Sequence, residues 1–159
     1  MDDYRAFNKA VNSICQEKKY VAIVDGFKPN VTKKHVQNIV EKNYPHVVAI
    51  EGQELIGWCG IVPNARQGFD HVGVLGLGVV KSHRGKGIGK KLLYDCLQRV
   101  KSTGIEKVEL EVFSDNGIAK KLYHSAGFEQ EGFKRKARKL DGCYQDIVVM
   151  ALFVEDVGT

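Results

Sequence analysis

Apolar residues recur at steps of three and four in two stretches near the start of the chain. This period predicts amphipathic helices over residues 2–18 and 32–42. Asp2 or Asp3 is expected to begin the first helix, and Thr32 is expected to cap the second. The apolar positions of the two helices are Tyr4, Phe7, Val11 and Ile14, followed by Val36, Ile39 and Val40.

Short runs rich in β-branched and aromatic residues predict strands along the rest of the chain. These runs cover residues 20–24, 47–50, 55–61, 69–81, 108–112, 128–137 and 143–153. Residues 51–54 are expected to close one hairpin. The dipeptide Asp141-Gly142, which is typical of tight turns, is expected to close the last one.

Two more helices fall among these strands. Apolar residues recur at helical spacing over residues 88–101, and a second helix is predicted to begin at residues 114–116 and to end at Gly127. The order of these elements predicts a single mixed-sheet α/β domain over residues 1–159.

The strand predicted at 69–81 is unusual in containing glycine, at positions 73, 76 and 78. Glycine inside a strand marks either a bulge or the close approach of a ligand to the backbone. A central strand that is tightly covered on both faces is the alternative interpretation.

The composition is that of an ordinary globular domain, with 43% hydrophobic and 27% charged residues. We expect a cytoplasmic protein, because no apolar run is long enough to cross a bilayer and the first residues do not resemble a signal peptide. Cys15, Cys59, Cys96 and Cys143 lie far apart in the sequence. This spacing favours reduced thiols over a metal site or a redox pair.

The formal charge of +5 raises the alternative of a polyanionic partner. The basic residues are nevertheless dispersed among acidic ones, except for a cluster within residues 134–139. A solvated hairpin face explains this cluster better than nucleic-acid binding does, so neither a nucleic acid nor a membrane is expected as a partner. A homodimer is left open.

A glycine-rich loop with basic residues joins the strand 69–81 to the helix that follows. The first N–H groups of a helix lack intrahelical partners and carry partial positive charge, so they bind anions. Three glycines leave those N–H groups accessible, and three basic side chains add positive charge around them, which predicts a pyrophosphate ligand. These residues are Gly85, Gly87 and Gly89, with Arg84, Lys86 and Lys90.

Spacing separates the phosphate-loop families that such a loop could represent. A Walker loop needs four residues between its first glycine and Gly-Lys, and here Gly85 precedes Gly89-Lys90 by only three. The dinucleotide fingerprint would place its last glycine at position 90, which is Lys. The pattern that remains is Arg84-x-x-Gly87-x-Gly89. The alternative interpretation is an ordinary glycine-rich turn with a solvated basic rim.

This hexapeptide resembles the coenzyme-A pyrophosphate loop of the GNAT superfamily of acyl-CoA-dependent N-acyltransferases. The segment 109–116 with Ala119, Leu122-Tyr123 and Gly127-Phe128 resembles the second motif of that superfamily. Residues 131–146 further resemble the branch that acetylates amino acids and protein N-termini. The likeness covers roughly residues 46–153, and the strand that usually precedes the first helix of the superfamily is not evident here.

The resemblance implies a mostly antiparallel sheet, splayed at the cofactor site and flanked by about four helices. It also implies that acetyl-CoA is the cosubstrate and that no metal is needed. The backbone of the splayed strand would bind the pantetheine arm, and the Leu77 N–H would polarise the acetyl carbonyl. The residues expected to bind the cofactor are Leu77, Gly78, Val79, Arg84, Gly85, Lys86, Gly87, Ile88, Gly89, Lys90, Asn116 and Tyr123.

Two residues are candidates for proton transfer. The resemblance implies that Tyr123 protonates the sulfur of the leaving coenzyme A, and the alternative is a packing role beside the apolar stripe of its own helix. The glutamate that some members carry on the loop-feeding strand is replaced here by Gly73. His71, on the same strand face by the period-two rule, is the substitute base, with a solvent-facing strand-end histidine as the alternative.

Together these observations predict an acetyl-CoA-dependent N-acetyltransferase that uses direct attack in a ternary complex. A small primary amine such as an amino acid is the expected acceptor, and a protein N-terminus or a polyamine is the alternative. A non-catalytic CoA-binding module is the rival from a different functional class.

Overall fold

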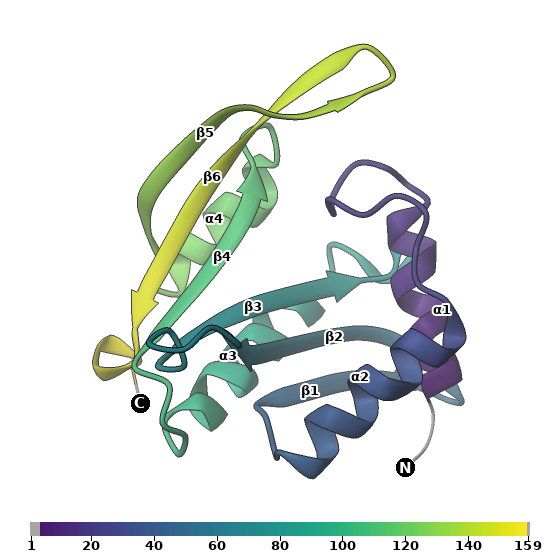
Figure 1. The fold of residues 1–159 in the computed structure, drawn as a ribbon. Helices are drawn as coiled ribbons and strands as arrows, with labels where there is room; N and C mark the ends of the chain where they lie inside the picture. The colour runs from purple at the N-terminus through teal and green to yellow at the C-terminus, as the bar shows by residue number, and fades with distance from the viewer. Residues whose placement is uncertain (1–3, 159) are drawn as a thin grey trace.

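The computed structural model describes residues 4–158, and it places helices on both faces of an open sheet (Figure 1). The helices are α1 (Tyr4–Cys15), α2 (Pro29–Glu41), α3 (Ile88–Val100) and α4 (Gly117–Ser125). The strands are β1 (His46–Glu51), β2 (Glu54–Pro63), β3 (Val72–Val79), β4 (Lys107–Phe113), β5 (Glu129–Leu140) and β6 (Cys143–Phe153).

The six strands form one sheet in the order β1-β2-β3-β4-β6-β5. β3 and β4 run parallel, and every other pair of neighbours is antiparallel. The predicted mixed, mostly antiparallel sheet is therefore confirmed. The turn at Asp141-Gly142 is also as predicted, since both residues adopt the positive φ angles, 49° and 79°, that such hairpin turns require.

Among the described residues, β3 and β4 are paired only where they begin. Their register runs from Val72↔Lys107 to Val74↔Glu109, whereas β2 stays paired with β3 as far as Val79, and β4 stays paired with β6 along its whole length. Beyond Val74 the two strands diverge. Figure 1 shows the result, a sheet divided into a β1–β3 half and a β4–β6 half that open away from each other.

Two apolar clusters cover the two faces of this sheet. The larger joins α3 and α4 to inward-facing strand residues such as Val108, Leu110 and Val112. The smaller packs α1 against the opposite face around Phe7 and Trp58, whose rings meet edge to face 5.4 Å apart. α1 therefore lies on one face of the sheet, and α3 and α4 lie on the other.

The close covering of the sheet explains two of the three glycines of β3. An added Cβ at Gly73 would lie 2.4 Å from Ile61, and one at Gly78 would lie 2.4 Å from Trp58. At Gly76 an added Cβ would meet no atom within 4 Å. Two of the three glycines thus belong to a tightly covered strand, and the third faces open space.

The predicted strand at 20–24 was wrong, because these residues form an irregular segment between α1 and α2. Their backbone is held by a side chain and not by a neighbouring strand, since Arg138 donates hydrogen bonds to the carbonyl oxygens of Lys18 (2.8 Å) and Val21 (3.0 Å). β-Propensity depends strongly on such context. The expected role of Asp2 or Asp3 lies outside the described residues.

The cap prediction for Thr32 was also wrong. α2 begins at Pro29, after Lys28, because proline fits the first helical position. Thr32 is buried within the first turn and accepts a 2.7 Å hydrogen bond from the Asn8 side chain.

The strand predicted at 69–81 is shorter in the structure, since its first residues form a turn in which Val72 N–H donates to Phe69 O at 2.9 Å.

Candidate active site

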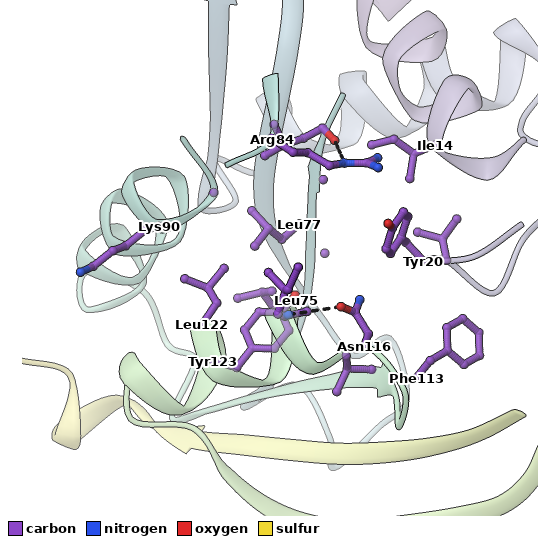
Figure 2. Close-up of a pocket in the computed structure, with 18 of the residues that line it drawn as sticks. Ile14, Tyr20, Leu75, Leu77, Arg84, Lys90, Phe113, Asn116, Leu122 and Tyr123 are labelled. Atoms are coloured by element: carbon purple, nitrogen blue, oxygen red, sulfur yellow. Dashed lines mark hydrogen bonds between the residues drawn. The ribbon is translucent and has the colours of Figure 1, made fainter. Parts of the chain in front are cut away.

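A cavity of about 560 Å³ lies where β3 and β4 separate (Figure 2). One part of its wall comes from β3, the following loop and the start of α3, and another from α4. The remainder comes from the end of β4, from β6, from α1 and from the segment after α1. The residues that line it include Leu75–Val79, Arg84, Gly85, Gly87–Lys90, Glu111–Phe113, Asn116, Tyr123, Ile14 and Tyr20–Ala22.

Backbone groups of β3 point into this opening. Val80 N–H donates to Ile56 O (2.9 Å), and Asn64 N–H donates to Val72 O (2.8 Å). In an antiparallel pair, hydrogen-bonded residues alternate with residues whose N–H and C=O face the other side. Even-numbered positions of β3 therefore face β2. The N–H and C=O of Leu77 face the gap beyond the last β3–β4 pair.

The N-terminus of α3 offers unpaired donors to the same cavity. Gly87 is the N-cap, with φ 78°, and the first intrahelical bond runs from Lys91 N–H to Gly87 O. The N–H groups of Ile88, Gly89 and Lys90 have no acceptor within the helix. Because an added Cβ at Gly87 would meet no atom within 4 Å, this approach is open, as an anion site requires.

The basic side chains of this loop do not all surround that site. The Arg84 guanidinium turns toward the segment that follows α1, where it forms a bidentate ion pair with Glu17 (2.6 and 2.8 Å). Its Nε donates to Val79 O at 2.9 Å. Lys90 directs its ammonium away from the cavity centre in Figure 2. The donors that this loop offers to the cavity are therefore mainly backbone N–H groups, and the expectation that the Arg84 charge faces a phosphate does not match this geometry.

α4 brings two predicted residues to the cavity. Asn116 caps the helix by accepting a hydrogen bond from Ala119 N–H (3.2 Å), drawn in Figure 2. Tyr123 is buried at 8% exposure, and its ring meets Phe128 edge to face. Burial raises the pKa of Tyr123 above its ordinary value, so its hydroxyl stays protonated and can act as a donor.

Glu111 is a lining residue that the sequence analysis missed. The neighbouring Val112 packs in the same cluster as Tyr123, and successive strand side chains point to opposite faces, so Glu111 lies on the α1 face of the sheet. Its carboxylate pairs with Lys134 of β5. The cavity thus has a phenol on the α3–α4 face and a carboxylate on the α1 face. The signal in the sequence was the position of Glu111 on the strand that splays.

The segment of residues 16–28, here named the acceptor strap, forms the wall on the α1 face. Tyr20, Val21 and Ala22 of this strap line the cavity. Among the described lining residues, the basic ones are His83, Arg84 and Lys90, all of which belong to the loop and α3. Besides apolar side chains and Glu111, the wall on the α1 face carries the Tyr20 ring and the Arg84 guanidinium, whose charge is already paired with Glu17.

His71 lies away from this cavity. It is exposed in the turn before β3, outside the strand on which the period-two rule had placed it, and the residues that line the cavity do not include it. The structure brings together the other predicted residues except Lys86, which also lies outside the lining. The base prediction for His71 is corrected because β3 begins only at Val72.

The basic cluster at 134–139 is partly used within the molecule. Lys134 pairs with Glu111, and Arg138 lies 4.3 Å from the Phe113 ring centroid while it holds the acceptor strap. No helix in the described part of the chain is long and apolar enough to cross a membrane. Across residues 4–158, no group of His, Cys, Asp and Glu side chains is arranged to hold a metal ion.

Comparisons with known proteins bear on this site. Residues 13–128 match the acetyltransferase (GNAT) family. The N-alpha-acetyltransferase RimI of Mycobacterium tuberculosis is 35% identical over 97 residues, 61% of this chain and 60% of that protein. The L-amino acid N-acetyltransferase AaaT of Escherichia coli is 30% identical over 106 residues, 66% of this chain and 65% of that protein. This chain spans about half to two thirds of such curated relatives.

A solved structure extends the likeness to the whole fold. The yncA protein of Salmonella typhimurium, solved with its cofactor acetyl-CoA, superposes with a TM-score of 0.90 at 20% identity. The match covers 99% of this chain and 91% of that one. At this identity the likeness concerns the fold alone.

Proposed function

The chain belongs to the acetyltransferase (GNAT) family, and on that premise we propose that it transfers the acetyl group of acetyl-CoA to the α-amino group of a peptide N-terminus. The observation that carries the transferase proposal is the opening between β3 and β4. The Leu77 N–H, the unpaired N–H groups of α3 and the Tyr123 hydroxyl all line it.

The cofactor fits the α3–α4 side of the cavity. Ile88, Gly89 and Lys90 N–H groups would hold its pyrophosphate, and the free backbone of β3 would hold its pantetheine arm. When bound, acetyl-CoA supplies an acetyl thioester, the activated acyl group of the reaction. Leu77 N–H would donate a hydrogen bond to the thioester oxygen as negative charge develops there.

Two side chains would move protons on opposite faces of the sheet. Glu111, on the α1 face, would accept a proton from the incoming ammonium, so that the amine can attack the carbonyl carbon. Tyr123, on the α3–α4 face, would donate its proton to the sulfur when the C–S bond breaks. The proton that the attacking nitrogen loses as the amide forms passes to solvent, and solvent reprotonates the Tyr123 phenolate. The raised pKa of Tyr123 keeps its hydroxyl protonated near neutral pH, so a proton is available when the sulfur leaves.

The charge distribution of the lining favours a peptide over a free amino acid. A free amino acid carries a carboxylate, and on the α1 face the described lining offers Glu111 and apolar side chains, while the Arg84 guanidinium there is already paired with both carboxylate oxygens of Glu17. In a peptide that carboxyl group is an amide, which is uncharged. The names of the two relatives specify N-alpha acetylation and acetylation of an L-amino acid, which supports an α-amine acceptor in either case.

Thiol release from acetyl-CoA with matched acceptors tests the proposal. Alanine, alaninamide and an alanine-initiated tripeptide share one α-amine and differ in the charge and length that follow it. We expect turnover with the amide and the tripeptide, and much less with free alanine. Equal turnover of free alanine would overturn the peptide assignment. Binding of acetyl-CoA without turnover of any amine would indicate a CoA-binding module.

A further inference from the structure

The Arg84 side chain joins the cofactor loop to the acceptor strap. Nε donates to Val79 O at the end of β3, and the two terminal nitrogens donate to both carboxylate oxygens of Glu17. The guanidinium also stacks over the Tyr20 ring, 4.5 Å from its centroid. These contacts use the three nitrogens of the fork and one of its faces, so the side chain acts as a tether.

The acceptor strap depends on such tethers. It contains no helix or strand, and fixing an irregular backbone has an entropic cost for every residue. Arg138 holds the strap from the β5–β6 hairpin through Lys18 O and Val21 O, and Arg84 holds it from the cofactor loop. Glu17 lies shortly before Tyr20 in the strap, so its position affects where Tyr20 and the following lining residues sit.

We propose that Glu17 is a positioning residue for the acceptor amine, because its ion pair with Arg84 fixes the position of the acceptor strap relative to the loop proposed to bind acetyl-CoA. The proposal rests on the proposed function for the identity of the two ligands. The pair is well suited to this role, since both side chains are mostly covered, at 29% and 22% exposure, and the contact is bidentate. The Arg84 guanidinium also holds the pKa of the Glu17 carboxyl below its ordinary value, so the pair is charged near neutral pH.

This arrangement separates the two substrates in a measurable way. Loss of the Glu17 charge weakens one of the two tethers, so the strap loosens while Arg138 still holds it, and the backbone donors of α3 stay in place. It also frees the positive charge of Arg84 next to the predicted pyrophosphate site. Acceptor binding should therefore weaken while acetyl-CoA binding is retained or strengthened.

Glu17→Gln tests this prediction, with Glu54→Gln as the matched control. Glu54 forms an exposed ion pair with Lys9 of α1, far less covered at 79% and 69% exposure. For Glu17→Gln we expect the KM for the acceptor to rise about tenfold while kcat stays near the wild-type value. This pattern is expected when a substitution removes binding energy that stabilises the ground state and the transition state equally. The Kd for acetyl-CoA should not weaken, and Glu54→Gln should change neither constant.

Trypsin cleavage of the free protein gives a readout that does not depend on turnover. Lys18 and Lys19 of the strap are exposed, so a loosened strap should be cut there faster in Glu17→Gln than in Glu54→Gln. If the wild-type protein acetylates no amine, the proposed function fails, but the cleavage rates still decide whether the tether exists.

Arg84→Met and the double variant complete the test. If the two residues act as one tether, Arg84→Met should raise the acceptor KM as Glu17→Gln does, and the double variant should add little. Two results would overturn the proposal. One is an unchanged acceptor KM and cleavage rate in Glu17→Gln. The other is a large loss of acetyl-CoA affinity in Arg84→Met alone, which would make Arg84 a phosphate ligand.

Discussion

The side of the cavity proposed to bind the cofactor and the side proposed to bind the acceptor, here called the cofactor side and the acceptor side, are built from the sequence in different ways. The cofactor side is a local structure, in which the end of β3, the loop and the first turn of α3 follow one another and present mainly backbone N–H groups. The acceptor side joins distant parts of the chain through side chains, with Glu17 and Arg84 67 residues apart and Val21 and Arg138 117 apart.

This difference predicts how each side tolerates change. A backbone site depends on φ angles and on space, so it is sensitive at its glycines and insensitive to most side chains. A site built from tethers depends on particular arginines and carboxylates, and it can adopt a new shape when one of them changes. Within one fold, the cofactor specificity would persist while the acceptor specificity varies.

The largest expected effect concerns the chemistry at the boundary of the two sides. Tyr123→Phe removes the proton donor but keeps the ring that packs on Phe128. We expect kcat to fall about 100-fold or more, the range for loss of a general acid, while acetyl-CoA affinity is kept. Steady-state kinetics and calorimetric binding measure the two quantities. An unchanged kcat would limit Tyr123 to a packing role.

The cofactor side alone should break with Gly87→Val. Gly87 has a φ of 78°, a conformation that a β-branched residue avoids by about 1–2 kcal/mol, so the loop should shift and its N–H groups lose their common direction. We expect acetyl-CoA binding to weaken about tenfold or more. Gly104→Val is the control, since an added Cβ at Gly104 also meets open space. Trypsin cleavage of the acceptor strap should not change in either variant.

The acceptor side should respond to Glu111→Gln. We expect kcat/KM for the acceptor to fall about tenfold at neutral pH, less than for loss of a compulsory base, because some amine arrives neutral. Raising the pH should restore activity as more acceptor becomes neutral. Glu109→Gln is the control, as Glu109 lies on the same strand and pairs with Lys107. Equal losses in both variants would assign the effect to surface charge.

The smallest expected effect is a dependence of stability on pH that arises beneath α1. Burial, with a contribution from His35, lowers the pKa of His46 to about 4 from an ordinary value of 6.5, and His46 packs against Phe7. The contribution of neutral His46 to the free energy of unfolding is fully present above pH 6.5. It is lost as the pH falls from 6.5 to about 4, because the histidine takes up a proton more readily in the unfolded chain than in the folded one.

From about pH 7 to about pH 5.5 this linkage should lower the free energy of unfolding by about 1 kcal/mol. Urea unfolding at the two pH values measures the change. His46→Phe keeps an aromatic ring in this place and removes the proton site, so its pH dependence should be smaller. An equal dependence in both proteins would place the titrating group elsewhere.

Local features of this fold could be predicted from the sequence, and contacts made by single side chains could not. The loop 84–90, the helix after it and the turn at Asp141-Gly142 are encoded by adjacent residues, and the structure has them where the pattern placed them. Thr32 appeared to be a cap because nothing in its own neighbourhood revealed the hydrogen bond from Asn8.

The same reason explains the errors at the site. Tyr20–Val24 looks like a strand, but the contacts that hold it come from Arg138, far along the chain. The Arg84 charge looked available for phosphate until Glu17 was found beside it. Glu111 was missed, since the alternation of apolar and charged residues along a strand does not reveal which part of it loses its neighbour.

The four cysteines of the chain differ in accessibility, and this has a practical consequence. Cys15, Cys59 and Cys96 are buried, whereas Cys143 is exposed beside the turn that joins β5 to β6. A maleimide dye should therefore label the native protein at a single position without any engineered change. Because Arg138 links the same hairpin to the backbone of Lys18, fluorescence from that dye offers a way to measure whether the hairpin moves when an acceptor is added.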